Sequence, residues 1–517
     1  MVKQLRVKNF RSIEDSGLID IKPITVFLGK NSCGKSSFIR ILPLLKQSLE
    51  KEIHEPLLWY GDYIDFGGFS EIMPKNKADI DCFELEFTLK LSNKRLERHI
   101  IRNMIDLMFY RSDEFNDSFK NVLIDVKIEF HKEEIKMISL NYSGQKIDIQ
   151  ITNEQIESIQ VNNNDSYDVK KYNLVYSSRD LLPELVCQIA EKLFFNKNDI
   201  ISELVEPIIN DLKSKTKCRI GNNTWNDLII KIIRMQSKNE LLEQLRQNKD
   251  SAKIREYFEG TDIEDELLNS INDQIQFVLL PYILKKVNQS LNASIENLYY
   301  IKPIRANANR YYRIQGIGVK QVDPDGSNLP MILYNLPKNR RNQFSEWCKE
   351  QLGISFSVKE TEGHISLMVN TGGDYEINIA DSGYGYSQVL PIILQIWLLS
   401  ENNKDNHSRF TSDYTILIEQ PELHLHPAFQ AKLAEMFVSF VNSLRQNNSN
   451  VNIIFETHSD VIINRLGTLV SDKLIDKNDI NIVLVEKKEG VSKFKQVGFE
   501  SNGLISEWPI GFMSPEA

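Results

Sequence analysis

Apolar residues gather in short runs near both ends of the chain, and polar or turn-forming residues separate these runs. Strand patterns are found at 4–7, 17–21, 24–28, 415–418, 452–455 and 481–485. Helical periodicity follows at 36–50 and 428–444, and Pro43 is expected to kink or shorten the first of these helices. Strands that alternate with helices predict an α/β fold with a largely parallel sheet covered on both faces.

The centre of the chain has a different pattern. Apolar and polar residues alternate at 83–89, 122–130 and 137–142, which predicts antiparallel strands. Helical spacing then predicts helices through Leu182, Leu185, Val186, Ile189, Ala190 and Leu193, and through Leu268, Ile271, Ile275, Val278 and Leu279. We therefore expect three parts: 1–165 with an antiparallel β lobe, a mostly helical insertion at 166–300, and 301–517, which returns to α/β texture and ends in a short aromatic tail at 503–512.

Composition narrows the class of protein. The 517 residues include 62 Lys and Arg and 71 Asp and Glu, a net charge of −9, so contact with DNA or RNA requires a local basic patch. The five cysteines are scattered and form no C-x-x-C, which argues against a disulfide framework and a zinc module and favours a reducing cytoplasm. The N-terminus leads into a strand rather than a signal peptide, and no run of apolar residues is long enough to span a membrane.

The segment 29–36, GKNSCGKS, carries the strongest chemical signal. It fits the phosphate-binding pattern G-x-x-x-x-G-K-[ST] and lies between a predicted buried strand and a predicted helix. A tight turn at a helix start points several backbone N–H groups at one anion. Lys35 is expected to reach the β- and γ-phosphates of ATP, and the Ser36 hydroxyl to bind Mg²⁺.

Three later segments carry further candidate chemistry. Glu419 ends a predicted strand, and a carboxylate there can hold Mg²⁺ through its hydration shell. His458 ends the next strand, where it is either a sensor of the γ-phosphate or an ordinary turn residue. The glycine-rich stretch 380–388 precedes a predicted helix at 389–399 and is either an anion site or an ordinary loop. His424 and His426 allow a metal, but a loop that meets a partner subunit fits them better.

Together these motifs resemble the ABC-type ATPase heads of the SMC superfamily. They are most similar to the prokaryotic branch that contains the overcoming-lysogenization-defect nucleases and the ATPase subunits of Septu and retron-linked antiphage systems. The resemblance is carried by 9–12, 29–37, 381–391, 416–427 and 455–460, and it does not cover about 165–300. It implies an ABC-type ATPase head with a mixed or parallel sheet and an antiparallel β lobe, interrupted by the helical insertion.

The resemblance also assigns roles to residues. ATP would contact Asn31, Ser32, Cys33, Gly34, Lys35, Ser36 and Ser37 of the phosphate loop, with Arg11 nearby. Ser382, Gly383, Gly385, Ser387 and Gln388 would cap the γ-phosphate held by the opposite subunit of a head-to-head dimer, or of a larger oligomer. His426 falls where the family's D-loop begins, and His458 on its switch histidine.

One position departs from the family pattern. Many relatives have two consecutive acids where this chain has Glu419 and Gln420, and the second acid usually acts as general base on the attacking water. Glutamine can orient a water but cannot take its proton. We therefore expect slow hydrolysis of ATP, or the use of Glu422 instead.

The resemblance also bears on partners. Only 59 residues follow His458, too few for the nuclease domain of the overcoming-lysogenization-defect proteins, so the nuclease is expected in a separate chain. Retron-linked versions would also bind a reverse transcriptase and its RNA–DNA product. Candidate nucleic-acid contacts, against the simpler interpretation as solvated or core residues, are Lys302, Arg305, Arg310, Arg313, Lys338, Arg340, Arg341, Tyr311 and Tyr312. The alternatives are a DNA-repair ATPase acting on DNA itself and a scaffold that merely binds nucleotide.

Overall fold

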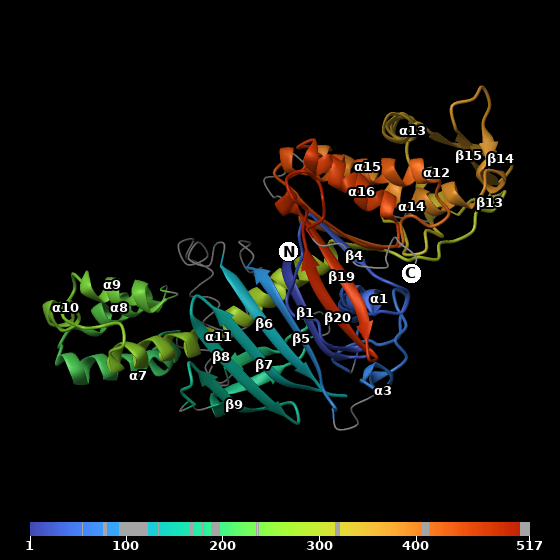
Figure 1. The fold of residues 1–517 in the computed structure, drawn as a ribbon. Coiled ribbons are helices and arrows are strands. Elements are labelled where there is room, and N and C mark those ends of the chain that lie inside the picture. The colour runs from blue at the N-terminus through green and yellow to red at the C-terminus, as the bar shows by residue number, and fades with distance from the viewer. Residues whose placement is uncertain are drawn as a thin grey trace. The chain divides into compact units, whose positions relative to one another are not determined.

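The computed structural model describes residues 1–53, 55–75, 80–91, 122–132, 134–165, 167, 169–177, 180–187, 197–233, 235, 237–315, 321–405 and 413–506 (Figure 1). The chain divides into two compact units. The first comprises Met1–Leu5, Ser48–Leu58 and Asp79–Ala293, and the second comprises Arg6–Gln47, Trp59–Ala78 and Ser294–Ala517. The second unit thus assembles segments from both ends of the sequence, while the division into three parts stays a prediction.

A six-stranded sheet forms the centre of the second unit. Its strands are β12 (Leu298–Ile301), β17 (Asp413–Glu419), β18 (Asn450–Thr457), β4 (Ile24–Leu28), β19 (Ile480–Lys488) and β20 (Val491–Val497), in that order. All neighbours are parallel except β19 and β20, which form an antiparallel hairpin. Every residue of β4 is buried, as expected for a central strand covered on both faces. The predicted α/β fold with a mixed sheet is confirmed.

Helices and short strands complete the second unit. The helices are α1 (Lys35–Ile39), α2 (Ile41–Glu50), α3 (Phe69–Ile72), α12 (Leu329–Asn335), α13 (Lys338–Leu352), α14 (Tyr384–Asp405), α15 (Pro427–Gln446) and α16 (Asp460–Ser471). The strands are β1 (Val2–Phe10), which begins in the first unit, β2 (Ile13–Asp15), β3 (Ile19–Asp20), β13 (Tyr312–Arg313), β14 (Ser355–Thr361), β15 (His364–Asn370) and β16 (Ile377–Asn378). Helices α15 and α16 lie side by side (Figure 1), and their buried faces join one core with the central sheet.

Local sequence explains where these helices begin and end. The helix predicted at 36–50 is interrupted at Arg40, four residues after Ser36, and restarts at Ile41. Pro43 causes this break, because it has no N–H to donate to the carbonyl of Ile39 and its ring crowds that carbonyl. Helix α16 begins after Ser459, whose side chain accepts a hydrogen bond from the N–H of Ile462.

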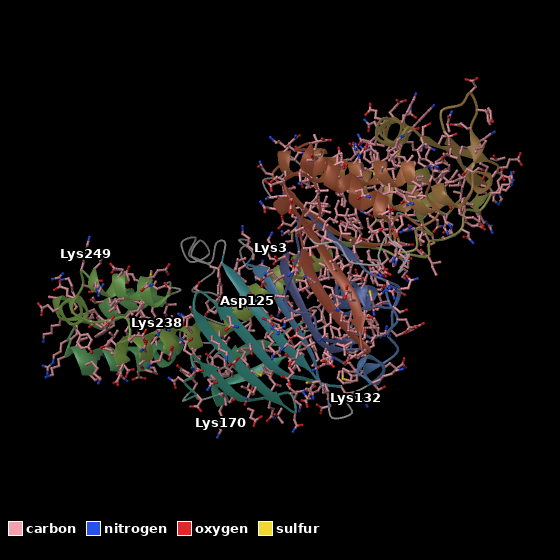
Figure 2. All side chains as sticks on the ribbon, in the orientation of Figure 1. Lys3, Asp125, Lys132, Lys170, Lys238 and Lys249 are labelled. Atoms are coloured by element: carbon pink, nitrogen blue, oxygen red, sulfur yellow. The ribbon has the colours of Figure 1, made fainter. Side chains whose placement is uncertain are left out.

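The first unit combines a meander with helices. Strands β5 (Phe83–Lys90), β6 (Leu123–Phe130), β7 (Ile135–Tyr142), β8 (Gln145–Thr152) and β9 (Gln155–Val161) pair antiparallel in sequence order. The helices are α7 (Lys197–Thr216), α8 (Asn222–Ile233), α9 (Lys238–Arg246), α10 (Ala252–Glu259) and α11 (Glu266–Glu296). Charged side chains such as Lys132, Lys170 and Lys249 are exposed on this unit (Figure 2). The predicted strands at 83–89, 122–130 and 137–142 and the helical run 268–279 are therefore confirmed.

The predicted helix through Leu182, Leu185 and Val186 is wrong. Residues Glu184–Cys187 form strand β11, which pairs antiparallel with β10 (Tyr172–Val175). Four or five residues are too few to distinguish a helical stripe from a buried strand, and here pairing with β10 decides the conformation. Ile189, Ala190 and Leu193 of the same predicted helix lie outside the described residues, as do residues 507–512 of the tail. No helix among the described residues is long and apolar enough to cross a membrane.

Candidate nucleotide-binding site

Three neighbouring parallel strands bring the sequence motifs to one edge of the central sheet. The phosphate loop follows β4, the segment with His458 follows β18, and the segment with Gln420 follows β17. Thr457 pairs with Leu28, and Glu456 pairs with Glu419, so these strands end nearly level. Parallel strands present their carboxyl ends at the same edge, which is where ligands bind in open α/β sheets.

The phosphate loop holds the charge of Lys35 at this edge. Gly34 has φ +109°, a left-handed conformation that favours glycine, and an added Cβ would collide with the side chain of Ser492. The next residue, Lys35, starts α1 and is buried. Its Nζ donates to the carbonyls of Gly29 at 2.9 Å and Lys30 at 3.0 Å, and lies 3.4 Å from Nε2 of His458. The lysine therefore links the loop to the segment that follows β18.

Ser36 is hydrogen-bonded to an acid that sequence reasoning did not select. Its Oγ donates to Oε2 of Glu456 at 2.7 Å. Burial, together with the nearby charge of Glu419, raises the pKa of Glu456 to about 7. A signal was nevertheless present in the sequence, because Glu419 and Glu456 each follow an apolar run of strand length. If two such strands are parallel neighbours, their acids lie together at the same edge of the sheet. Glu456 is the carboxylate that contacts the predicted Mg²⁺-binding hydroxyl.

Glu419 has a different set of partners. Its carboxylate accepts two hydrogen bonds from Arg40, at 2.7 and 2.6 Å, and one from the hydroxyl of Tyr300 at 2.5 Å. The residue is fully buried. Burial would lower the pKa of Arg40, but its hydrogen bonds with Glu419 raise the pKa overall. Both carboxylate oxygens of this buried acid thus bind one guanidinium with nearly ideal bidentate geometry, although the Arg40 side chain itself is 31% exposed.

The three residues expected to take part in hydrolysis lie around the end of β18. The N–H of Gln420, a residue with φ +47°, donates to the carbonyl of Glu456 at 3.0 Å. Oε1 of Glu422 accepts from the N–H of His458 at 2.8 Å, and burial raises the pKa of Glu422. Burial and the charge of Lys35 lower the pKa of His458, so its imidazole is neutral near pH 7.

Arg305 links two of the predicted motifs from inside the protein. Only 3% of its surface is exposed, which contradicts its predicted role in contacting nucleic acid. Nη1 donates to the carbonyl of Gln388 at 3.1 Å, and Nη2 to the carbonyl of Glu419 at 2.8 Å. Burial lowers the pKa of Arg305 to about 10, although the charges of Glu422 and Glu419 oppose this shift. Spacing in sequence could not reveal the burial of this arginine, because its partners are carbonyls on distant elements.

The glycine-rich stretch is largely helical. Helix α14 begins at Tyr384, so Gly385, Ser387 and Gln388 lie within its first turns, and the expectation that all the glycines precede the helix is wrong. Gly385 packs so closely on the next motif that an added Cβ would lie 2.6 Å from the carbonyl oxygen of His424. Ser382 and Gly383 precede the helix, and Ser382 Oγ donates to the carbonyl of Ile379 at 2.8 Å.

His426 serves the fold as a helix cap. Its Nδ1 accepts a hydrogen bond from the N–H of Ala428 at 3.2 Å, and Pro427 occupies the first position of α15. The exposed ring of His424 lies 6.0 Å from that of Tyr384, centre to centre. His424 therefore lies beside the start of α14, and His426 lies at the start of α15.

An open pocket of about 680 Å³ adjoins the phosphate loop. It is lined by Ser32, Cys33, Gly34, Lys35, Ser36 and Ser37 of the loop, by Arg11, Ser12 and Glu14, by Glu71, Met73, Pro74 and Lys75, and by Lys487, Gly490 and Val491. The guanidinium of Arg11 lies 4.7 Å from the ring centre of Phe66, and burial is the main cause that lowers its pKa. Asn31 is exposed at the tip of the loop. The pocket's size is typical of sites for cofactors.

Most of the predicted nucleic-acid contacts have partners within the protein. Lys302 donates to the carbonyl of Asp62, Arg310 pairs with Asp381, Arg340 with Glu401 and Arg341 with Glu360. Tyr312 is half-buried, and its hydroxyl accepts from the N–H of Asn309, so its ring does not stand out as a stacking platform. Tyr311, Arg313 and Lys338 are exposed. Fewer of these side chains are therefore available to contact nucleic acid than the sequence predicts.

The model of the AAA ATPase domain family matches residues 1–463, and the chain belongs to this family. Endonuclease GajA of Bacillus cereus is 24% identical over 367 residues, which cover 60% of this chain and 50% of GajA. The uncharacterized protein MJECL10 of Methanocaldococcus jannaschii is 28% identical over 138 residues, which cover 26% of this chain and 55% of that protein. The chain thus spans about half the length of the curated relatives it matches.

Solved structures of Smc heads are also similar. The Smc head bound to the C-terminal winged-helix domain of ScpA aligns with a TM-score of 0.36 at 12% identity, over 97% of this chain and 98% of that one. The Smc head of Pyrococcus furiosus with an extended coiled coil gives 0.37 at 12% identity, over 96% of each chain. At this identity the likeness concerns the fold alone.

Proposed function

We propose that this chain binds ATP with Mg²⁺ and acts as the regulatory ATPase subunit of a prokaryotic antiphage defence complex. In this proposal it dimerises through ATP and holds or controls a nuclease in a separate chain. One observation carries the nucleotide part: Lys35, Ser36 and His458 meet at one sheet edge beside a pocket of about 680 Å³. The donor set fits the ligand, because hydroxyl and carboxylate oxygens suit Mg²⁺ and the ammonium suits phosphate.

We infer these roles for the chain's own residues. The N–H groups of the phosphate loop and the Lys35 ammonium orient the phosphates, and Ser36 supplies an oxygen to Mg²⁺. Glu456 is the acid in direct contact with Ser36, at 2.7 Å. It therefore joins the predicted Glu419 as a candidate for orienting the ion's water shell. Mg²⁺ supplies neutralisation of phosphate charge when bound.

Slow hydrolysis is part of the proposal. Gln420, which stands where the general base is expected, has no proton-accepting group. The contact of Glu422 with the N–H of His458 uses Oε1 alone, so Glu422 remains the candidate base. A slow ATPase would persist in its ATP-bound state and suit a subunit that waits for a trigger.

The proposed dimer and the proposed nuclease partner each have one line of support. The resemblance to dimeric ATPase heads implies that Ser382, Gly383, Gly385, Ser387 and Gln388 face the nucleotide of a partner subunit. Gln388 is buried against Arg305, so its role in this proposal is to position the helix rather than to touch phosphate. The link to a nuclease is supported by the similarity to endonuclease GajA.

A direct experiment combines binding with partner capture. Mg²⁺–ATP binding is measured on the purified chain, on Lys35→Ala and on the control Lys473→Ala, an exposed lysine away from the pocket. The tagged chains are then recovered from their native operon with ATP present, and bound proteins and nucleic acids are identified. We expect wild type and the control to bind ATP and to recover a nuclease, with or without a reverse transcriptase and RNA–DNA. Recovery of a nuclease by Lys35→Ala in equal yield would contradict nucleotide control.

The DNA-repair alternative makes the opposite prediction. An ATPase that acts on DNA itself should be recovered as a bare homodimer, and DNA ends should stimulate its hydrolysis. Comparing ATPase rates with and without linear DNA therefore separates the two functions. A several-fold stimulation by DNA in the absence of any partner would replace the proposed function.

A further inference from the structure

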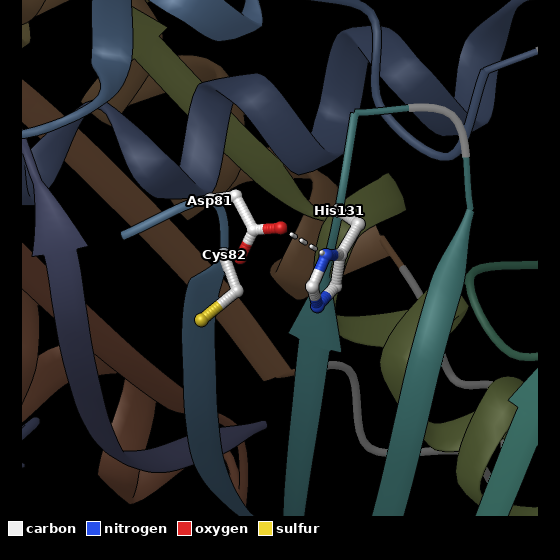
Figure 3. Close-up of side chains that lie close together, drawn as sticks. All are labelled: Asp81, Cys82 and His131. Atoms are coloured by element: carbon white, nitrogen blue, oxygen red, sulfur yellow. Dashed lines mark ion pairs between the residues drawn. The ribbon is translucent and has the colours of Figure 1, made fainter. Parts of the chain in front are cut away.

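Three side chains of types that can bind a metal meet in the first unit, whereas the nucleotide motifs belong to the second. Asp81 and Cys82 come immediately before β5, and His131 comes immediately after β6. Phe83 pairs with Phe130 in the antiparallel ladder, so Cys82 and His131 are the next pair across the two strands. Figure 3 shows the three side chains at these strand ends. One ligand atom from each lies within 4.8 Å of the others.

A fourth residue orients the histidine. Nδ1 of His131 lies 3.6 Å from Oδ2 of Asp81, and its Nε2 lies 3.4 Å from Oε1 of Glu129. Glu129 is on β6 two residues before the histidine, so its side chain projects on the same face. A carboxylate at one ring nitrogen fixes the ring and its tautomer, and leaves the other nitrogen to bind metal.

We propose that Asp81, Cys82 and His131 bind a zinc ion, with Glu129 positioning the histidine. Thiolate, imidazole and carboxylate together are the ligands that zinc accepts in tetrahedral sites. Zinc bonds of about 2.0–2.3 Å require ligand atoms roughly 3.3–3.8 Å apart. Side-chain rotation of Cys82 and Asp81 can supply the remaining ångström, because the Asp81 side chain is 84% exposed and not constrained by packing. Three protein ligands leave the fourth position to water.

This site is independent of the proposed ATPase function. Its ligands flank a pair of neighbouring strands, so a bound ion ties the end of β6 to the beginning of β5. The sequence contains no C-x-x-C, and on that ground we expected no zinc module; the proposed site departs from this expectation because it needs only one cysteine. The two halves of the site are 49 residues apart (131 − 82) and meet only through strand pairing.

The test uses the full chain after treatment with a chelator. Co²⁺ is added as a spectroscopic substitute for zinc, and Zn²⁺ affinity is measured by competition with a chromophoric chelator. We expect one equivalent of metal, a thiolate-to-cobalt charge-transfer band and the intense visible absorption of tetrahedral cobalt. Cys82→Ser should abolish the charge-transfer band and weaken Zn²⁺ binding at least ten-fold. Glu129→Gln should weaken Zn²⁺ binding by about ten-fold while retaining the band.

Two controls keep the proposal open to refutation. His364→Gln alters an exposed histidine of the other unit and should leave metal binding unchanged, whereas His131→Gln should remove it. Circular dichroism establishes that each variant is folded. A cobalt spectrum unaffected by Cys82→Ser, or the absence of any one-equivalent Zn²⁺ binding by the wild-type chain, would overturn the proposal.

Discussion

Replacing Glu456 by glutamine tests how this site responds to protons and to Mg²⁺–ATP. In the folded chain the pKa of this carboxyl is about 7, against an ordinary value of 4.5, because the group is buried beside Glu419. Its folded form therefore holds a proton that the unfolded chain releases between about pH 4.5 and 7. As pH rises through this window, the free energy of unfolding should fall. The difference of 2.5 pKa units corresponds to about 3 kcal/mol.

Glu456→Gln should remove this loss of stability at high pH. The amide oxygen can still accept the hydrogen bond from Ser36, but it carries no charge to bury. The variant's free energy of unfolding should exceed that of the wild type by up to about 3 kcal/mol at pH 8 and change little at pH 4.5. Urea unfolding of both chains at these two pH values measures the effect.

Nucleotide binding provides a second test of the protonation of the Glu456 carboxyl. A cation beside the carboxylate favours its charged form, so binding of Mg²⁺–ATP should expel the proton. With a pKa of about 7, the expected release is about 0.5 proton at pH 7 and about 0.1 at pH 8. Isothermal titration calorimetry in buffers of different ionisation enthalpy, at saturating Mg²⁺, counts these protons. If Glu456→Gln releases as many protons as the wild type, the assignment of the raised pKa to Glu456 is refuted.

Further predictions concern the buried contacts of the second unit, each measured by urea unfolding against the wild type. Arg40→Met leaves the buried Glu419 carboxylate without its ion-pair partner and should lower stability by about 3–5 kcal/mol; a loss under 1 kcal/mol would show that the pair is dispensable. Gly385→Ala forces its methyl against the His424 carbonyl and should cost about 1–3 kcal/mol, while an unchanged midpoint would contradict this close approach. Ser459→Ala removes a helix cap and should cost about 1 kcal/mol, whereas Ser459→Thr, whose hydroxyl can still accept from Ile462 and donate to Gln430, should recover most of the loss.

The phosphate loop could be predicted because its functional residues are consecutive in the sequence. A strand, a turn with Gly34 and a helix starting at Lys35 need no knowledge of distant contacts. The same holds for β17, β18 and β19, whose apolar runs are long enough to identify. The break after Ile39 was also predictable, since Pro43 imposes it locally.

The pairing of acids and bases in the site could not be predicted from the sequence. Ser36 and Glu456 are 420 positions apart, and Arg40 and Glu419 are 379 apart. Their contacts exist because β4 lies beside β18 and β18 beside β17, an order that periodicity does not encode. The burial of Arg305 was missed for the same reason: a basic residue is usually exposed, and only the fold reveals that its partners are carbonyls.

Arg305 makes the two ends of the site mechanically interdependent. One rigid guanidinium spans the carbonyl of Gln388 near the start of α14 and the carbonyl of Glu419 at the end of β17. In the proposed dimer, a shift of the glycine-rich helix would therefore either move the end of β17 or break one of these two buried hydrogen bonds. Gln420 directly follows Glu419 in the chain, so its position is coupled to that of α14 through the side chain of Arg305.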